Sequence, residues 1–379
     1  MRFFICFLIL ALTFSATLLF AKGPPPGTGV GDVKANIMIM LDNSGSMSRT
    51  DQVSGLNTNT VDLAVANNGD IFAVDSHQHR VSRLDSSYAV KGQIGGFNSR
   101  NNDTNFNVKF STPAGIAMDQ SDLTDEFFYV ANHNRQNGRN GFTQSNISKV
   151  CTGITITGVC PEMGRLVAVA DPGMNMSGIA VQGNYLYAMG TDKILFKYNK
   201  LNLVEVTRRN INSKIQNFDA SRSDIAAVGT YVLVSNYHNR EFCRFNASDL
   251  SDATFAASGD NCKNLGFRPR AMTVAGKTTA STSDDEIYIW RNSSSATIKK
   301  YSVDTGVELF ITNIARGSGP GQTRNSIAID VDSSGNLYAA EVGSSNRLYV
   351  SKFNNSLTYV DRGPGGGPPQ NRMQIAHAA

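Results

Sequence analysis

A short apolar motif recurs six times along the chain at spacings close to fifty residues. Each copy is a row of small and branched apolar residues, several of them preceded by Asp or Gly. The centres of the copies are Leu63, Ile116, Ile179, Ile225, Met272 and Ile327. They lie 53, 63, 46, 47 and 55 residues apart, and 52 residues follow the last one. A period of this length predicts a repeat architecture in which each repeat is one supersecondary unit.

Each repeat contains the same succession of strand signals. A polar turn follows the apolar motif, as at residues 67–70, and a strand rich in aromatic and β-branched residues comes next, as at 231–234. A third, alternating strand such as 80–85 follows, and a weaker fourth such as 307–311 closes the repeat. No segment has the sustained apolar spacing of an amphipathic helix. We therefore expect an all-β fold, a six-bladed β-propeller over residues 56–361 with few or no helices and a short N-terminal extension.

Several of these repeats resemble the NHL repeat. The strings that carry the likeness are GIAMD at residues 115–119, VDSHQHRVSRLD at 74–85 and VSNYHNREFCRFN at 234–246. The likeness is weaker in the third and fifth repeats, which lack the His/Arg corner. It implies a six-bladed propeller in which four histidines occupy blade corners: His77, His79, His133 and His238.

The two ends of the chain differ from the repeats. Residues 1–21 combine Arg2 with an apolar stretch that ends at Ala21, which predicts a signal peptide; an uncleaved membrane anchor is the alternative. Residues 22–55 form a spacer, and the Gly/Pro-rich residues 362–379 form a tail that we expect to be disordered. A membrane contact is expected only through an uncleaved leader.

Composition narrows the choice of compartment and partner. The formal net charge is +4, only 17% of the residues are charged, and no Lys/Arg cluster forms a stripe. Nucleic-acid binding is therefore not expected. A chain that is exported and poor in charge is expected to be secreted, periplasmic or on the cell surface.

Four cysteines remain once the leader, which contains Cys6, is removed. An even number in an exported chain predicts disulfides. Of the three connectivities, two local pairs are the simplest: Cys151 with Cys160, and Cys243 with Cys262. Free thiols or a zinc site are the alternative, but the chain has neither CxxC spacing nor a His next to a cysteine.

One motif before the repeats has the chemistry of a metal site. The apolar segment 37–41 is followed by Asp42-Asn43-Ser44-Gly45-Ser46. This DxSxS loop resembles the metal-ion-dependent adhesion site of von Willebrand factor A domains, and with the propeller it is similar to type IV pilus tip adhesins. The likeness implies that Asp42, Ser44 and Ser46 hold Mg²⁺ or Mn²⁺, the only cofactors indicated. The rest of that domain is missing, so a remnant, a site completed elsewhere and coincidence all stay open.

Other candidate ligands are fewer. Asp75, His77 and His79 are either metal ligands or a hydrogen-bonded blade corner, and their place in the repeat favours the corner. The carboxylates expected on the inner strands, where a channel metal would bind, are Asp119, Asp330 and Asp332, and they form no repeated ring. No GxSxG, Walker loop or HExxH motif occurs.

These observations favour an exported, non-enzymatic binding, adhesion or scaffold module that takes a protein or glycan ligand at one face of the propeller. Two alternatives remain open at this point. One is a propeller enzyme of the lyase or lactonase type with a divalent metal in its central channel. The other is a truncated relative of a larger pilus-associated adhesin.

Overall fold

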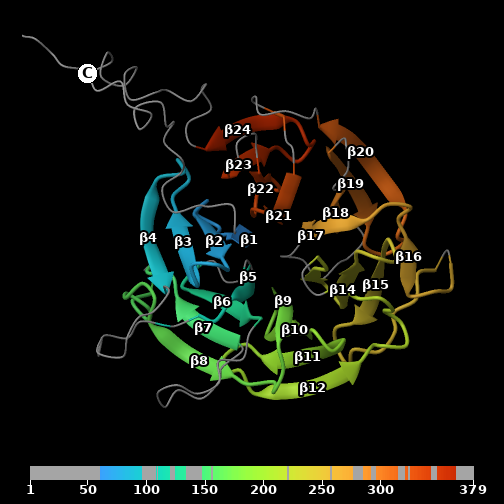
Figure 1. Cartoon of the computed structure of the whole chain (residues 1–379), viewed down its shortest axis with the longest axis horizontal. Coiled ribbons are helices and arrows are strands. Elements are labelled where there is room, and N and C mark those ends of the chain that lie inside the picture. Colours follow the sequence, from blue (N-terminus) through green and yellow to red (C-terminus); the bar gives the residue numbers. More distant parts are fainter. Residues whose placement is uncertain are drawn as a thin grey trace, which may run out of the picture. The chain divides into compact units, whose positions relative to one another are not determined.

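The described part of the chain contains twenty-four β-strands, which form the propeller that the repeats predict (Figure 1). The structure is a computed structural model, and it describes residues 60–95, 108, 110–119, 124–133, 147–154, 157–219, 222–256, 258–275, 285–291, 296–314, 321–322, 325–342 and 348–363. These ranges contain no helix. The chain divides into two compact units, residues 1–47 and 48–379, and every described residue belongs to the second.

Each blade is an antiparallel sheet of four consecutive strands, numbered here from the innermost strand outward. Blade 1 contains β1 (Thr60–Val65), β2 (Ile71–Asp75), β3 (Arg80–Leu84) and β4 (Val90–Gly95); blade 2 contains β5 (Pro113–Met118), β6 (Phe127–Asn132), β7 (Ile147–Cys151) and β8 (Leu166–Ala170). Blade 3 contains β9 (Met176–Gln182), β10 (Tyr185–Gly190), β11 (Ile194–Asn199) and β12 (Glu205–Asn210); blade 4 contains β13 (Ile225–Val228), β14 (Tyr231–Asn236), β15 (Glu241–Asn246) and β16 (Cys262–Asn264). Blade 5 contains β17 (Pro269–Ala275), β18 (Glu286–Arg291), β19 (Ala296–Ser302) and β20 (Glu308–Ile314); blade 6 contains β21 (Asn325–Val331), β22 (Leu337–Val342), β23 (Leu348–Phe353) and β24 (Tyr359–Gly363).

The six apolar motifs form the innermost strands, as predicted. Each inner strand contacts the inner strands of the two neighbouring blades, and β21 contacts β1, so the ring closes (Figure 1). Leu63 pairs with Ala73, and the equivalent pair in blade 6 joins Ile329 to Ala339. The centre of the sixth motif is therefore Ile329 rather than Ile327, two residues further along the strand.

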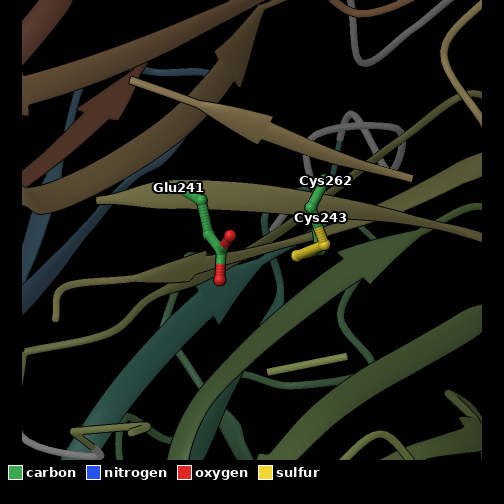
Figure 2. A group of neighbouring side chains, drawn as sticks. All are labelled: Glu241, Cys243 and Cys262. Atoms are coloured by element: carbon green, nitrogen blue, oxygen red, sulfur yellow. A yellow bond between two sulfur atoms is a disulfide. The ribbon is translucent and has the colours of Figure 1, made fainter. Parts of the chain in front are cut away.

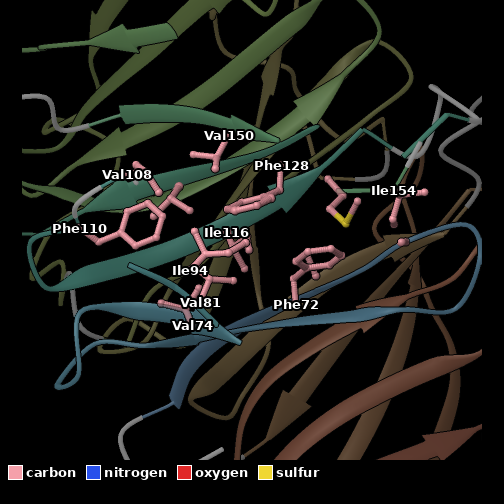
Figure 3. Packing of buried hydrophobic residues seen from close by; sticks show 14 residues of the cluster. Phe72, Val74, Val81, Ile94, Val108, Phe110, Ile116, Phe128, Val150 and Ile154 are labelled. Carbon is pink, nitrogen blue, oxygen red and sulfur yellow. The ribbon is translucent and has the colours of Figure 1, made fainter. Parts of the chain in front are cut away.

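The hydrophobic core is divided among the six interfaces between adjacent blades. Each interface has its own cluster of buried side chains, drawn from the facing surfaces of two sheets. Figure 3 shows the cluster between blades 1 and 2, where Phe72 and Phe128 lie with ring centroids 5.4 Å apart. Because the motif strands are buried on both faces, they are apolar in a row rather than in alternation.

Both local disulfides expected from the sequence are present. Cys151 at the end of β7 is bonded to Cys160 in the following loop. Cys243 and Cys262 face each other in the register of β15 and β16, so this bond joins two strands rather than a strand and a loop. Two disulfides are consistent with folding in an oxidising compartment outside the cytoplasm.

The last strand runs slightly beyond the predicted end of the propeller. β24 continues through Arg362 and Gly363, which the sequence placed in the tail. The Arg362 guanidinium is buried against Glu341, with Nη2 and Oε2 2.9 Å apart.

The predicted signal peptide, the spacer and residues 364–379 lie outside the described residues.

Candidate ligand site at the mouth of the channel

A β-bulge near the start of the inner strand recurs in five of the six blades. In blade 5, Pro269 pairs with Arg291 and Ala271 pairs with Trp290, so Arg270 is an extra residue without a partner. The same interruption occurs at the start of the other inner strands, except in blade 4. The five bulged residues are Val61, Ala114, Ser177, Arg270 and Ile327. A bulge bends the strand locally and redirects the side chain of the extra residue.

All five bulged residues line one cavity of about 210 Å³, which we call the mouth cavity. The other residues that line the cavity lie just before the inner strands, among their first residues, or directly after the second strands of blades 1 and 2. The cavity is therefore at the end of the channel where the inner strands begin. Its polar groups come from Asp62, Ser76, Thr112, His133, Ser177, Arg222, Ser223, Asp224 and Arg270. The inner-strand bulges thus supply part of the lining of a polar, ligand-sized cavity at one face.

Two carboxylates from opposite blades lie at the inner end of the mouth cavity. Asp62 in blade 1 accepts the backbone N–H groups of Leu63 and of Ile116 in blade 2, both at 2.8 Å. Asp224 in blade 4 accepts those of Ile225 at 2.8 Å and of Met272 in blade 5 at 3.0 Å. Each carboxylate therefore links its own inner strand to the next one around the ring.

The pKa values of both carboxyls are raised. Burial is the main cause for Asp62, and the negative charge of Asp224 adds to it. Burial also raises the pKa of Asp224, to about 6, against the backbone hydrogen bonds that lower it. Groups with raised pKa values in a cavity are typical of ligand or catalytic sites, although structural carboxylates show them too.

A third carboxylate, Asp330 of β21, lies deeper in the channel. It accepts a hydrogen bond from the backbone N–H of Val65 at 2.8 Å and one from Thr273 Oγ1 at 2.9 Å. With Asp62 and Asp224 it lines a smaller cavity of about 60 Å³, bounded by residues of all six inner strands. The sequence pointed to Asp330 but missed Asp62 and Asp224, which precede the apolar centres of their motifs and can be recognised there.

The other two carboxylates expected on inner strands lie elsewhere. Asp119 forms an ion pair with Lys200 of the neighbouring blade. Asp332 belongs to the turn between β21 and β22, where it accepts the N–H groups of Ser334 at 2.9 Å and Asn336 at 2.8 Å. Neither residue lines either cavity, so this part of the sequence interpretation was wrong.

The rim of the mouth cavity is basic. Arg222 Nε lies 3.5 Å from Asp219 Oδ2, and the Arg222 guanidinium packs over the ring of Tyr237. Burial lowers the pKa of Arg270, and the positive charge of Arg222 lowers it further. Within the described residues, the Arg270 guanidinium makes neither a hydrogen bond nor an ion pair.

The four corner histidines differ in what they contact. His79 Nδ1 accepts the backbone N–H of Thr112 at 2.8 Å, which fixes a blade corner. His133 lines the mouth cavity, and its Nδ1 lies 3.3 Å from the Met176 carbonyl oxygen. Because a carbonyl only accepts hydrogen bonds, Nδ1 carries the proton and Nε2 is an acceptor when the ring is neutral.

Asp75 and His238 also make polar contacts at blade corners. Asp75 accepts the backbone N–H of Gln78 at 3.0 Å and pairs with Arg80. His238 Nε2 lies 3.4 Å from Asp219 Oδ2, near the rim of the mouth cavity. His77 and His79 do not belong to any cluster of three metal-ligating side chains among the described residues.

A single cluster of three metal-ligating side chains occurs in the described part of the chain. It consists of Glu241, Cys243 and Cys262, whose ligand atoms lie within 4.8 Å of one another (Figure 2). Both sulfurs belong to the disulfide, and Glu241 Oε1 accepts hydrogen bonds from the amides of Asn236 and Asn239. A disulfide has no thiolate to offer, so this cluster does not fit a metal ion.

The metal ligands predicted in the DxSxS loop, Asp42, Ser44 and Ser46, lie outside the described residues.

No protein-family model and no curated protein sequence matches this chain. The class of protein is therefore defined by the fold: a six-bladed β-propeller with two disulfides. Among the described residues, no helix has the length and apolar character needed to span a membrane.

Proposed function

We propose that this chain is an exported, non-enzymatic binding module of the NHL type, acting in adhesion or as a scaffold. Its partner is a protein or glycan that binds at the face on which the mouth cavity lies. The leader-like residues 1–21 and the two disulfides support export to the periplasm, the cell surface or the medium. The mouth cavity is the observation that carries the assignment of the face.

The use of the cavity carboxylates supports binding rather than catalysis. All four carboxylate oxygens of Asp62 and Asp224 accept backbone N–H groups of inner strands. They hold neighbouring blades together, which gives them a structural role. A cavity with donors on its rim and acceptors at its inner end is typical of a ligand site.

A binding screen tests this proposal. The full-length chain is immobilised and presented with arrays of glycans and of peptides, and Arg270→Ala is presented in parallel. Arg208→Ala is the matched control, because Arg208 is exposed on the outer strand β12. We expect ligands that bind the wild type and the control but not Arg270→Ala. Ligands that bind all three chains equally would place the binding face elsewhere.

The second candidate is a propeller enzyme, which the raised pKa values of Asp62 and Asp224, in the cavity that His133 also lines, favour. A carboxyl that titrates near neutral pH can act as a general acid or base. Turnover of a lactone or uronide substrate that is lost in Asp224→Asn, with the fold retained, would establish this candidate. Binding without turnover of the ligands found in the screen supports the binding module.

A further inference from the structure

We propose that the mouth cavity binds a monosaccharide-sized ligand bearing one carboxylate, with the carboxylate held by Arg270 and Arg222 and the hydroxyl groups held at the inner end. This inference rests on the proposed function, since it names the ligand class of the same face. The shared chemistry is that of a sugar acid, whether it is free or the end of a longer glycan.

The two guanidiniums supply the anion site. Arg270 occupies a bulge that turns it toward the cavity, and it makes no hydrogen bond or ion pair within the described residues. Burial and the positive charge of Arg222 lower its pKa, and Tyr237 and the negative charge of Asp219 offset this in part. A ligand carboxylate would give the Arg270 guanidinium the ion pair that the described residues do not supply. A planar carboxylate matches the two parallel N–H donors of a guanidinium.

A single negative charge suits this rim better than two. Arg222 already has a carboxylate neighbour, since its Nε lies 3.5 Å from Asp219 Oδ2. Asp62 and Asp224 at the inner end repel additional negative charge whenever they are ionised. A monoanion therefore gains the attraction of the rim with less of this repulsion than a phosphate ester would meet.

The inner end of the cavity is suited to hydroxyl groups. The Oγ atom of Ser223 is buried and has no hydrogen-bond partner, and a buried polar group of this kind calls for one. Each carboxylate oxygen of Asp62 and Asp224 accepts one backbone N–H and retains capacity for a second donor. His133 adds an acceptor nitrogen when neutral. Sugar hydroxyls both donate and accept, so they can use all of these groups.

The cavity has room for about one monosaccharide unit. Its volume is about 210 Å³. A longer glycan would place its terminal residue in the cavity and extend over the face. Free and polymeric sugar acids therefore share the same contacts.

The test is isothermal titration of the full-length chain with glucuronate, glucose and inorganic phosphate in separate runs. We expect glucuronate to bind, and glucose and phosphate to bind at least about tenfold more weakly, because each lacks one half of the recognition. Arg270→Gln should weaken glucuronate binding by about tenfold to a hundredfold. Ser223→Ala should weaken both sugars, and the control Arg208→Gln should change nothing.

The outcomes separate this inference from the proposed function. Equal affinity for phosphate and glucuronate would reduce the cavity to a nonspecific anion site and overturn the inference. No glucuronate binding, combined with array ligands that Arg270→Ala loses, would also overturn it and leave the proposed function standing. Arg270→Lys keeps the charge without the paired donors, so full binding by this variant would contradict the role given to the guanidinium. A terminally glucuronylated oligosaccharide, run beside glucuronate, distinguishes a glycan end from a free sugar acid.

Discussion

The carboxylate of Asp330 accepts a hydrogen bond from the backbone N–H of Val65 at 2.8 Å, across 265 residues of sequence. It joins the last inner strand to the first. Every sheet of this propeller consists of four consecutive strands, so no sheet among the described residues combines strands from both ends of the repeat region. The ring is closed instead by this hydrogen bond and by the apolar cluster between blades 6 and 1, which includes Leu63 and Tyr338.

Removing the closing carboxylate should destabilise the whole ring. Asp330→Ala removes the hydrogen bonds that Asp330 accepts from the N–H of Val65 and the hydroxyl of Thr273. We expect the free energy of unfolding in urea to fall by about 2–3 kcal/mol. Asp192→Ala is the control, because Asp192 lies in the exposed turn between β10 and β11 and should change nothing measurable. Equal stability of both variants would show that the apolar cluster closes the ring alone.

The channel carboxyls should make stability depend on pH. The pKa of Asp224 is raised to about 6 from 3.8, and that of Asp62 is raised well above 3.8. Between the unfolded and folded pKa values the folded chain binds more protons, so its stability falls as the pH rises through this window. The stabilisation that comes from protonating the two carboxyls is fully present below about pH 4, and it is lost once the pH exceeds their pKa values in the folded chain. For each carboxyl it amounts to about 1.4 kcal/mol per unit of difference between the folded and unfolded pKa values.

The double variant Asp62→Asn/Asp224→Asn isolates this effect. It cannot titrate at these positions, so its unfolding free energy should change less between about pH 4 and pH 7 than that of the wild type. Chemical denaturation at several pH values measures both slopes. If the two slopes coincide, the pKa values of these carboxyls are not raised in the folded chain.

Arg244 should be irreplaceable by lysine. Its buried guanidinium donates to the carbonyl oxygens of Val303 at 2.6 Å and Asp304 at 2.8 Å, which belong to the neighbouring blade 5. A lysine has the charge but not the planar fork, so it would lose some of the hydrogen bonds that the guanidinium donates. Arg244→Lys should lower the unfolding free energy by about 3 kcal/mol, while Arg208→Lys on the exposed strand β12 should have no measurable effect. Thermal denaturation of the two variants compares them directly.

The two disulfides should differ in their effect on stability. Cys243 and Cys262 are 19 residues apart, and Cys151 and Cys160 are 9 residues apart. Each should contribute about 2–4 kcal/mol, and loop closure favours the longer loop by about 0.6 kcal/mol. Urea denaturation of the two paired Cys→Ala variants measures the contribution of each disulfide to the free energy of unfolding.

Non-reducing peptide maps should recover both local pairs, and a peptide joining Cys151 to Cys243 would contradict the blade assignment.

Metal binding by the DxSxS loop stays a prediction of the sequence. Three ligands from one loop, Asp42, Ser44 and Ser46, are fewer than Mg²⁺ usually requires, so we expect weak binding by the wild type. Asp42→Ala should remove it, because two neutral hydroxyls cannot hold a dehydrated divalent ion. Calorimetric titration with Mg²⁺ and Mn²⁺ measures both chains. Tight binding that survives Asp42→Ala would point to the channel and revive the enzyme candidate.

Local patterns were sufficient for the architecture. Each motif such as Asp62–Val65 is buried on both faces, and each second strand such as β14 is buried along most of its length. Both strands must therefore be mainly apolar in every blade. The period of the motifs then predicted the number of blades. The cysteine pairs were equally predictable, because each pair is close in sequence and lies within one blade.

The mouth cavity could not be predicted in this way. Arg270 reads as an ordinary residue at the start of a strand, and only its pairing with β18 shows that it occupies a bulge. Asp62 and Asp224 stand 162 residues apart, and although both precede the apolar centre of a motif, the motif alone does not show that blades 1 and 4 place them in one cavity. Sequence alone determined the strands, their number and their order, because burial imposes a pattern on neighbouring residues. Only the tertiary structure decided which side chains meet at the channel, because strand register and ring closure are set by contacts between residues far apart in the chain.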